Sequence, residues 1–194
     1  MVVIKYRDLH LNYRRFWRLK MQISLSDLMA YTEWERRKWY QCLRQHGETV
    51  LRISVGPHRD DRFESVGDWV RHIFAAEIRY VERLGGRPLT DPASIPNDNI
   101  EAIFEFSQRS RKELRNLIET LPAPEWDTPA DYKILNYHVK ATPRKIVTHV
   151  LLHEIRHWAQ IATVLRLNGV VDEFHDFLGS PVMGGEWKRE EAQK

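Results

Sequence analysis

The sequence has one cysteine and no long hydrophobic run. Cys42 has no second cysteine with which to form an internal disulfide, as is typical of proteins in reducing compartments. No apolar stretch approaches the roughly 20 residues that cross a bilayer. The first twenty residues also lack an apolar stretch of about seven residues followed by a small-residue cleavage site, so we expect no secretory signal. We therefore expect a cytoplasmic protein without a membrane partner.

An excess of charge of one sign is also missing. The 194 residues include 30 Lys and Arg against 27 Asp and Glu, which argues against nucleic acid as a partner. Only residues 1–22 are strongly basic, and we interpret them as an N-terminal extension. We expect one domain over residues 23–180 and a C-terminal tail over 181–194. A domain of this size needs no structural metal, so any bound metal is expected to serve function.

Four segments show the spacing of amphipathic helices, and Pro and Gly residues separate them. We predict helices over about residues 24–46, 65–84, 98–121 and 143–168, with Thr142 as the N-cap of the last. Alternating residues over 131–139 predict a short strand or hairpin. Four long helices and almost no strand predict an all-α four-helix bundle with a strand or hairpin excursion before the last helix.

The last predicted helix carries His149, His153 and His157, four residues apart. Residues at this spacing share one face of a helix, so two of these imidazoles can converge on one ion. All three cannot. His149 and His157 lie about 12 Å apart along the axis at about 1.5 Å per residue, whereas ligands of one ion lie within roughly 4 Å of one another.

The spacing of core positions selects one pair. A seam with alternating steps of four and three residues passes through Ile146, Val150, His153, His157, Gln160 and Val164. It places His153, His157 and Gln160 inside the bundle. Buried imidazoles cost free energy unless something binds them. Two histidines do not complete the coordination of an ion, and His72 is the other histidine centred in a predicted helix. We predict one divalent cation held by His72, His153 and His157. The simpler alternative is that these histidines are hydrogen-bonded core or surface residues.

The segment from His153 to His157 also matches HExxH, the zinc-peptidase motif in which the glutamate, here Glu154, activates a metal-bound water. The longer metzincin pattern is absent, because Gln160 and Thr163 replace its glycine and third histidine. A third ligand such as Glu173 keeps the peptidase interpretation open. Against it, the chain offers little strand for an extended peptide, and Glu154 points about 100° away from the ligand face, as a surface charge would.

These two histidine-bearing segments resemble the DinB-like family of metal-binding four-helix bundles, which includes bacillithiol- and mycothiol-dependent enzymes. The resemblance covers about residues 22–180 and rests on the stretches from Trp69 to Tyr80 and from His149 to Gln160. It implies His72, His153 and His157 as metal ligands, an up-up-down-down bundle and a homodimer. Family members often continue HRGQ at the second histidine of the pair, whereas this chain keeps the glutamine but has Trp158 and Ala159 in between.

Three neutral imidazoles bind zinc, nickel, iron or manganese and leave positions open, as catalytic sites do. We predict metal-dependent transfer of a low-molecular-weight thiol, with zinc or nickel as the first candidates for the ion. Hydrolysis by HExxH-type water activation and non-catalytic, stress-related metal binding are the alternatives. Candidates for a supporting role around the ion are Glu77, Tyr80, Glu154 and Gln160. A packed tyrosine and a solvated glutamate are the simpler interpretations of Tyr80 and Glu77.

Overall fold

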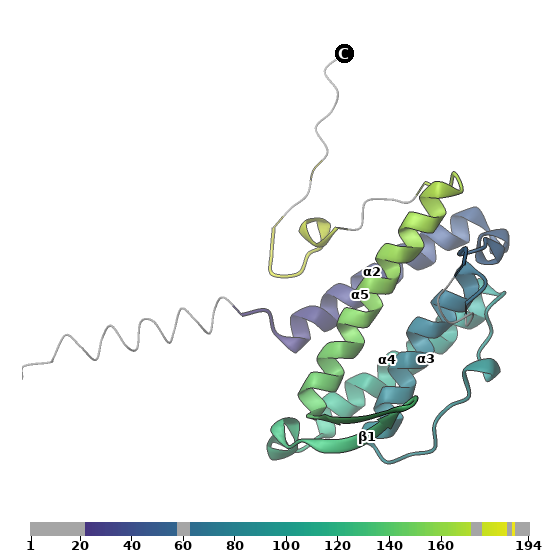
Figure 1. Cartoon of the computed structure of the whole chain (residues 1–194). Helices are drawn as coiled ribbons and strands as arrows, with labels where there is room; N and C mark the ends of the chain where they lie inside the picture. The colour runs from purple at the N-terminus through teal and green to yellow at the C-terminus, as the bar shows by residue number, and fades with distance from the viewer. Residues whose placement is uncertain (1–21, 58–62, 172–175, 186–187, 189–194) are drawn as a thin grey trace, which may run out of the picture.

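The computed structural model of the chain describes residues 22–57, 63–171, 176–185 and 188. Within them lie four long helices, α2 (Leu25–His46), α3 (Val66–Leu84), α4 (Ile100–Thr120) and α5 (Pro143–Leu167), and a hairpin of β1 (Ala130–Ile134) and β2 (Tyr137–Ala141) (Figure 1). Four short 3-10 helices accompany them: Glu48–Arg52, Pro92–Ser94, Ala123–Asp127 and Phe177–Gly179. The all-α bundle and the hairpin before its last helix are confirmed. No described helix is long and apolar enough to span a membrane.

Side chains at the helix starts fix where the helices begin. The Ser24 and Ser65 hydroxyls accept the backbone N–H of Asp27 and Asp68, whose carboxylates in turn accept the serine backbone N–H, so α2 and α3 both begin with a capping box. Thr142 accepts a backbone N–H at the start of α5, which confirms the predicted N-cap. These local signals explain why the predicted helix ends lie within two residues of the observed ones.

The helices run in the order up, down, down, up (Figure 1). Contacts between α2 and α5 advance along both helices together, whereas contacts between α3 and α5 advance in opposite directions. Each of α2 and α3 packs against α4 and α5. Helices α3 and α4 are therefore parallel, and the segment that joins them, residues 85–99, crosses the length of the bundle. This order of helix directions differs from the up-up-down-down order that the family resemblance implied. All three helix connections are long enough to cross the bundle, so loop length did not identify which one does.

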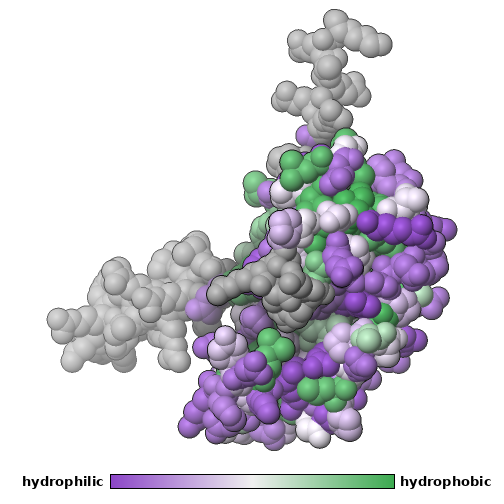
Figure 2. Space-filling view, turned by 45° about the vertical axis from the view of Figure 1, so that its right-hand side comes forward, coloured by the Kyte–Doolittle hydropathy of each residue, from purple (hydrophilic) through white to green (hydrophobic). Residues whose placement is uncertain are grey.

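The core consists of two apolar clusters with a polar layer between them. One cluster, which we call the upper cluster, includes Trp39, Phe74 and Trp158, and the lower cluster includes Val81 and Leu114. On each of the four helices, buried polar residues lie between the positions that supply the two clusters. On the face shown in Figure 2, hydrophilic residues cover most of the surface and apolar residues form separate patches.

The buried face of α5 differs from the predicted seam. Gln160 is exposed and His153 only partly buried. The buried face includes Val147, Leu151, Glu154, Trp158, Ile161 and Leu165. The placement of Gln160 inside the bundle is therefore wrong. The reason is Glu154, which hydropathy assigns to the surface although the residue is only 1% exposed.

Candidate metal centre

The three predicted ligands meet between α3 and α5. His72 Nε2 lies 3.1 Å from His153 Nε2, which lies 3.0 Å from His157 Nε2. One ligand atom from each of the three residues lies within 4.8 Å of the other two. Two nitrogens that bind a tetrahedral ion at about 2.1 Å each are expected about 3.4 Å apart. We call these three residues the histidine triad, and their spacing fits a shared metal ion.

Hydrogen bonds between the rings do not account for this convergence. A neutral imidazole nitrogen is either one donor or one in-plane acceptor. His153 Nε2 has a neighbouring Nε2 atom on two sides, so it can form a ring-to-ring hydrogen bond with only one of them. A cation between the rings would accept a lone pair from all three. The donor set therefore suits a divalent cation better than an uncharged cluster.

The electrostatic environment keeps the central ring neutral. Burial, with a smaller contribution from His157 and His72, lowers the pKa of His153 to about 2. Neutral imidazole is the form that binds a metal, whereas imidazolium repels it. His153 is therefore in its metal-binding form at neutral pH.

Aromatic side chains pack around the triad. The ring centroid of Phe63 lies 4.7 Å from that of His72, and the Trp69 ring lies 6.4 Å from His157. His149, by contrast, is exposed and packs edge-on against Tyr80 at 5.4 Å. His149 therefore lies beside the triad rather than in it, as the spacing argument predicted.

A cleft of about 450 Å³ opens over the triad. Tyr80 and Gln160, two of the four candidates for a supporting role, line it, as do Ile134 and Leu135 at the tip of the hairpin. Figure 1 shows the hairpin at the end of the bundle where α3 finishes and α5 begins. A small molecule in this cleft would contact both the triad and the hairpin.

The chain matches the model of the DinB family over residues 21–189. The chain belongs to the DinB family. The match covers all four long helices, the hairpin and the triad, so the resemblance found in the sequence is confirmed. No curated protein matches the chain in a sequence comparison.

The core of this DinB bundle contains a second polar cluster that the sequence did not reveal. Arg36 donates to Glu154 Oε1 at 2.6 Å and to Glu77 Oε2 at 2.9 Å. Arg111 donates to Glu154 Oε2 at 2.7 Å and lies 3.1 Å from Glu77 Oε2. All four residues are at most 6% exposed, and their charges cancel. We call Arg36, Glu77, Arg111 and Glu154 the charge quartet.

The charge quartet decides what Glu154 can do. Burial opposes its ionisation, but the two guanidinium groups outweigh burial and lower the pKa of Glu154. Trp158 Nε1 adds a donor to Glu154 Oε1 at 3.2 Å, so both oxygens are engaged within the core. The interpretation of Glu154 as a surface charge is therefore wrong, as is that of Glu77 as a solvated glutamate. Neither carboxylate is among the residues that line the cleft.

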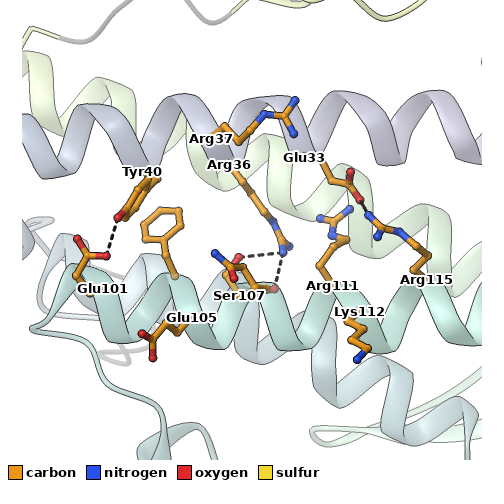
Figure 3. Close-up of a pocket in the computed structure, with 12 residues that line it drawn as sticks. Glu33, Arg36, Arg37, Tyr40, Glu101, Glu105, Ser107, Arg111, Lys112 and Arg115 are labelled. Atoms are coloured by element: carbon orange, nitrogen blue, oxygen red, sulfur yellow. Dashed lines mark hydrogen bonds and ion pairs between the residues drawn. The ribbon is translucent and has the colours of Figure 1, made fainter.

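A second cavity, of about 350 Å³, lies between α2 and α4, on the side of the DinB bundle opposite the α3–α5 face. Figure 3 shows Arg36 reaching across it to Ser107, while Tyr40 bonds Glu101 at one end and Glu33 pairs with Arg115 at the other. The charge quartet thus lies between this second cavity and the histidine triad. Two sequence-based candidates lie outside the described residues: Glu173 as a third ligand, and most of the extension over residues 1–22.

Proposed function

We propose that this DinB-family protein is a metal-dependent enzyme that transfers a low-molecular-weight thiol to a small-molecule acceptor, with His72, His153 and His157 as the ligands of one divalent cation. The convergence of three Nε2 atoms beside an open cleft is the observation that carries the proposal. When bound, the cation supplies Lewis-acid chemistry that lowers the pKa of a thiol or of water. Zinc or nickel is our first choice, with iron and manganese as further candidates, because imidazole binds all four.

Different residues would bind the cation and the substrate at the cleft. The triad would hold the cation, while Tyr80 and Gln160 line the cleft and are available to orient a substrate. The single cysteine, Cys42, is buried in the upper cluster and cannot supply a reactive thiol there. A thiol that reacts in the cleft therefore has to be a small molecule.

Hydrolysis of the HExxH type is disfavoured. In that chemistry the glutamate accepts a proton from water, which requires a carboxylate that reaches the reacting atoms. Both Glu154 oxygens instead accept hydrogen bonds from arginine and tryptophan side chains in the core. Non-catalytic metal binding is the remaining alternative, and the experiment below separates it from thiol transfer.

A cytoplasmic homodimer is the physiological form that we propose. The chain has one cysteine and cannot form an internal disulfide, which fits a reducing compartment. The homodimer rests on the family resemblance, and sedimentation of the purified protein tests it.

Elemental analysis of protein purified without a histidine tag tests the metal site. We expect one divalent metal per chain in the wild type, no stoichiometric metal in His153→Ala, and retained metal in His149→Ala, the matched control one turn away on α5. Retention by His153→Ala together with loss by His149→Ala would show that His149, and not His153, is a metal ligand. Turnover of the metal-loaded protein with bacillithiol, mycothiol or glutathione and an electrophilic acceptor tests thiol transfer. Metal binding without turnover of any thiol or ester would leave only the binding function.

A further inference from the structure

Three arginines converge on the cleft over the histidine triad. Arg79 and Arg83 from α3 and Arg156 from α5 line it. Arg79 donates to the Thr90 carbonyl at 2.5 Å, and Arg83 to the Arg79 carbonyl at 3.2 Å. Among the residues that the structure describes, no carboxylate forms an ion pair with any of the three.

These arginines leave the cleft with positive charge that no described carboxylate pairs with directly. Burial and the neighbouring Arg79 lower the pKa of Arg83, so its cationic form is destabilised where it stands. Glu82, next to Arg83 in sequence, offsets only part of this destabilisation, because its carboxylate accepts the backbone N–H and the hydroxyl of Thr90 and forms no ion pair with Arg83. A cation held by the triad would add further positive charge. An anion in the cleft would relieve this repulsion.

The hairpin supplies the cleft with an apolar wall. Leu135 sits at the tip with φ of 52°, in the left-handed region where a bulky side chain is an outlier and glycine or asparagine is preferred. The residue is 60% exposed, and it lines the cleft together with Ile134 and Phe63. The positive φ costs conformational free energy, and an exposed leucine side chain does not offset that cost by packing in the core. Contact with a ligand in the cleft explains why a large apolar side chain occupies this turn.

We infer that the cleft binds an organic anion, with the acidic group between Arg79, Arg83 and Arg156 and the apolar part against Leu135 and Ile134. The cleft volume of about 450 Å³ lies in the range of small-molecule sites. This inference rests on the proposed function in one respect: the anion is either the thiol or its acceptor. Its binding, however, can be measured without any turnover.

Calorimetric titration with hexanoate, acetate and 1-hexanol tests the inference. Hexanoate should bind the metal-loaded wild type at least about tenfold more tightly than acetate, which lacks the apolar part, or 1-hexanol, which lacks the charge. Hexanoate should also bind the metal-free His153→Ala protein, because the arginines and not the metal hold the carboxylate. Equal affinity for hexanoate and 1-hexanol would overturn the inference. So would loss of hexanoate binding in His153→Ala, which would make the carboxylate a metal ligand.

Two variants locate the binding groups. Arg83→Ala should weaken hexanoate binding about tenfold, whereas Arg109→Ala, which removes an exposed arginine of α4 outside the cleft, should not. Leu135→Gly should weaken binding of hexanoate but not of acetate, and its unfolding midpoint should be equal to or higher than that of the wild type, because glycine accepts the positive φ. Unchanged hexanoate affinity in Arg83→Ala refutes the arginine site. A Leu135→Gly protein that binds hexanoate normally refutes the apolar wall.

The outcomes separate this inference from the proposed function. Binding of hexanoate without turnover of any thiol would support the anion site and refute the transferase. Thiol turnover without preference for hexanoate over 1-hexanol would support the transferase and refute the anion site.

Discussion

Replacing Glu154 by glutamine tests whether the charge quartet is a structural element of the core. The two arginines and two glutamates have no net charge together, and all four are almost fully buried. Glutamine keeps the size of the side chain but leaves one positive charge uncompensated. Its amide N–H₂ would also face guanidinium groups that themselves only donate.

The expected loss of stability is large. Removing one partner of a buried ion pair costs about 3–5 kcal/mol, because the other partner keeps its desolvation penalty. Glutamine still offers one oxygen to accept a hydrogen bond from Arg36 or Trp158, so we expect the lower end, about 3 kcal/mol, for Glu154→Gln. A domain has only about 5–15 kcal/mol of stability in total, so this is a substantial fraction.

Urea unfolding followed by tryptophan fluorescence measures this loss. Trp39 and Trp158 are buried and stacked, with ring centroids 5.1 Å apart, so their emission should change when the core opens. Asp127→Asn is the matched control: it breaks the exposed pair with Arg144, and the unfolding midpoint should stay within experimental scatter. A loss below about 1 kcal/mol in Glu154→Gln would refute the buried-pair argument.

The same variant separates the structural role of Glu154 from the peptidase role. We expect Glu154→Gln to keep its stoichiometric metal under conditions where it remains folded. If it stays as stable as the wild type but loses hydrolytic turnover by orders of magnitude, Glu154 is a general base after all.

Three further outcomes follow from the same contacts. The pKa of Glu154 is depressed below its ordinary value of 4.5 in the folded protein, so the stability linked to its ionisation is fully present above about pH 4.5 and is lost as the pH falls through the lower folded pKa. The unfolding midpoint of the wild type should therefore decline on acidification, and more steeply than that of Glu154→Gln; parallel declines would contradict this. In Gly67→Ala, the new Cβ would overlap the Asn97 backbone carbonyl, so urea unfolding should show a loss of about 1–3 kcal/mol in stability. An unchanged unfolding midpoint would mean that the segment containing Asn97 moves aside. Thr142→Ala removes the N-cap of α5 and should cost about 1 kcal/mol in the same assay, whereas no loss would show that water replaces the cap.

Local signals explain how much of the fold could be predicted. Each helix begins at a capping residue and ends near a glycine, proline or asparagine, and these signals need no knowledge of distant contacts. The pair His153 and His157 was likewise recognisable, because a spacing of four residues on a helix fixes their relative position. His72 required the additional step that one ion needs a third ligand from another helix.

The charge quartet could not be predicted because its members share no local pattern. Each of the four long helices contributes one residue, and only the packing of the bundle brings them together. Hydropathy assigns a lone Glu or Arg to the surface. This assignment displaced the predicted seam of α5 and placed Gln160 inside the bundle. The expected order of helix directions was wrong for a related reason, because that order depends on which helix faces pack together.

The two faces of α5 explain why a peptidase motif occurs in this bundle. His153 and Glu154 are consecutive, so their side chains leave the helix about 100° apart. The histidine meets His72 of α3, whereas the glutamate meets Arg36 of α2 and Arg111 of α4. A rotation of α5 about its axis that brought Glu154 toward the cleft would carry His153 away from His72. The charge quartet therefore fixes the rotation that points the histidines at one another, and the contacts that hold the glutamate in the core also position the triad.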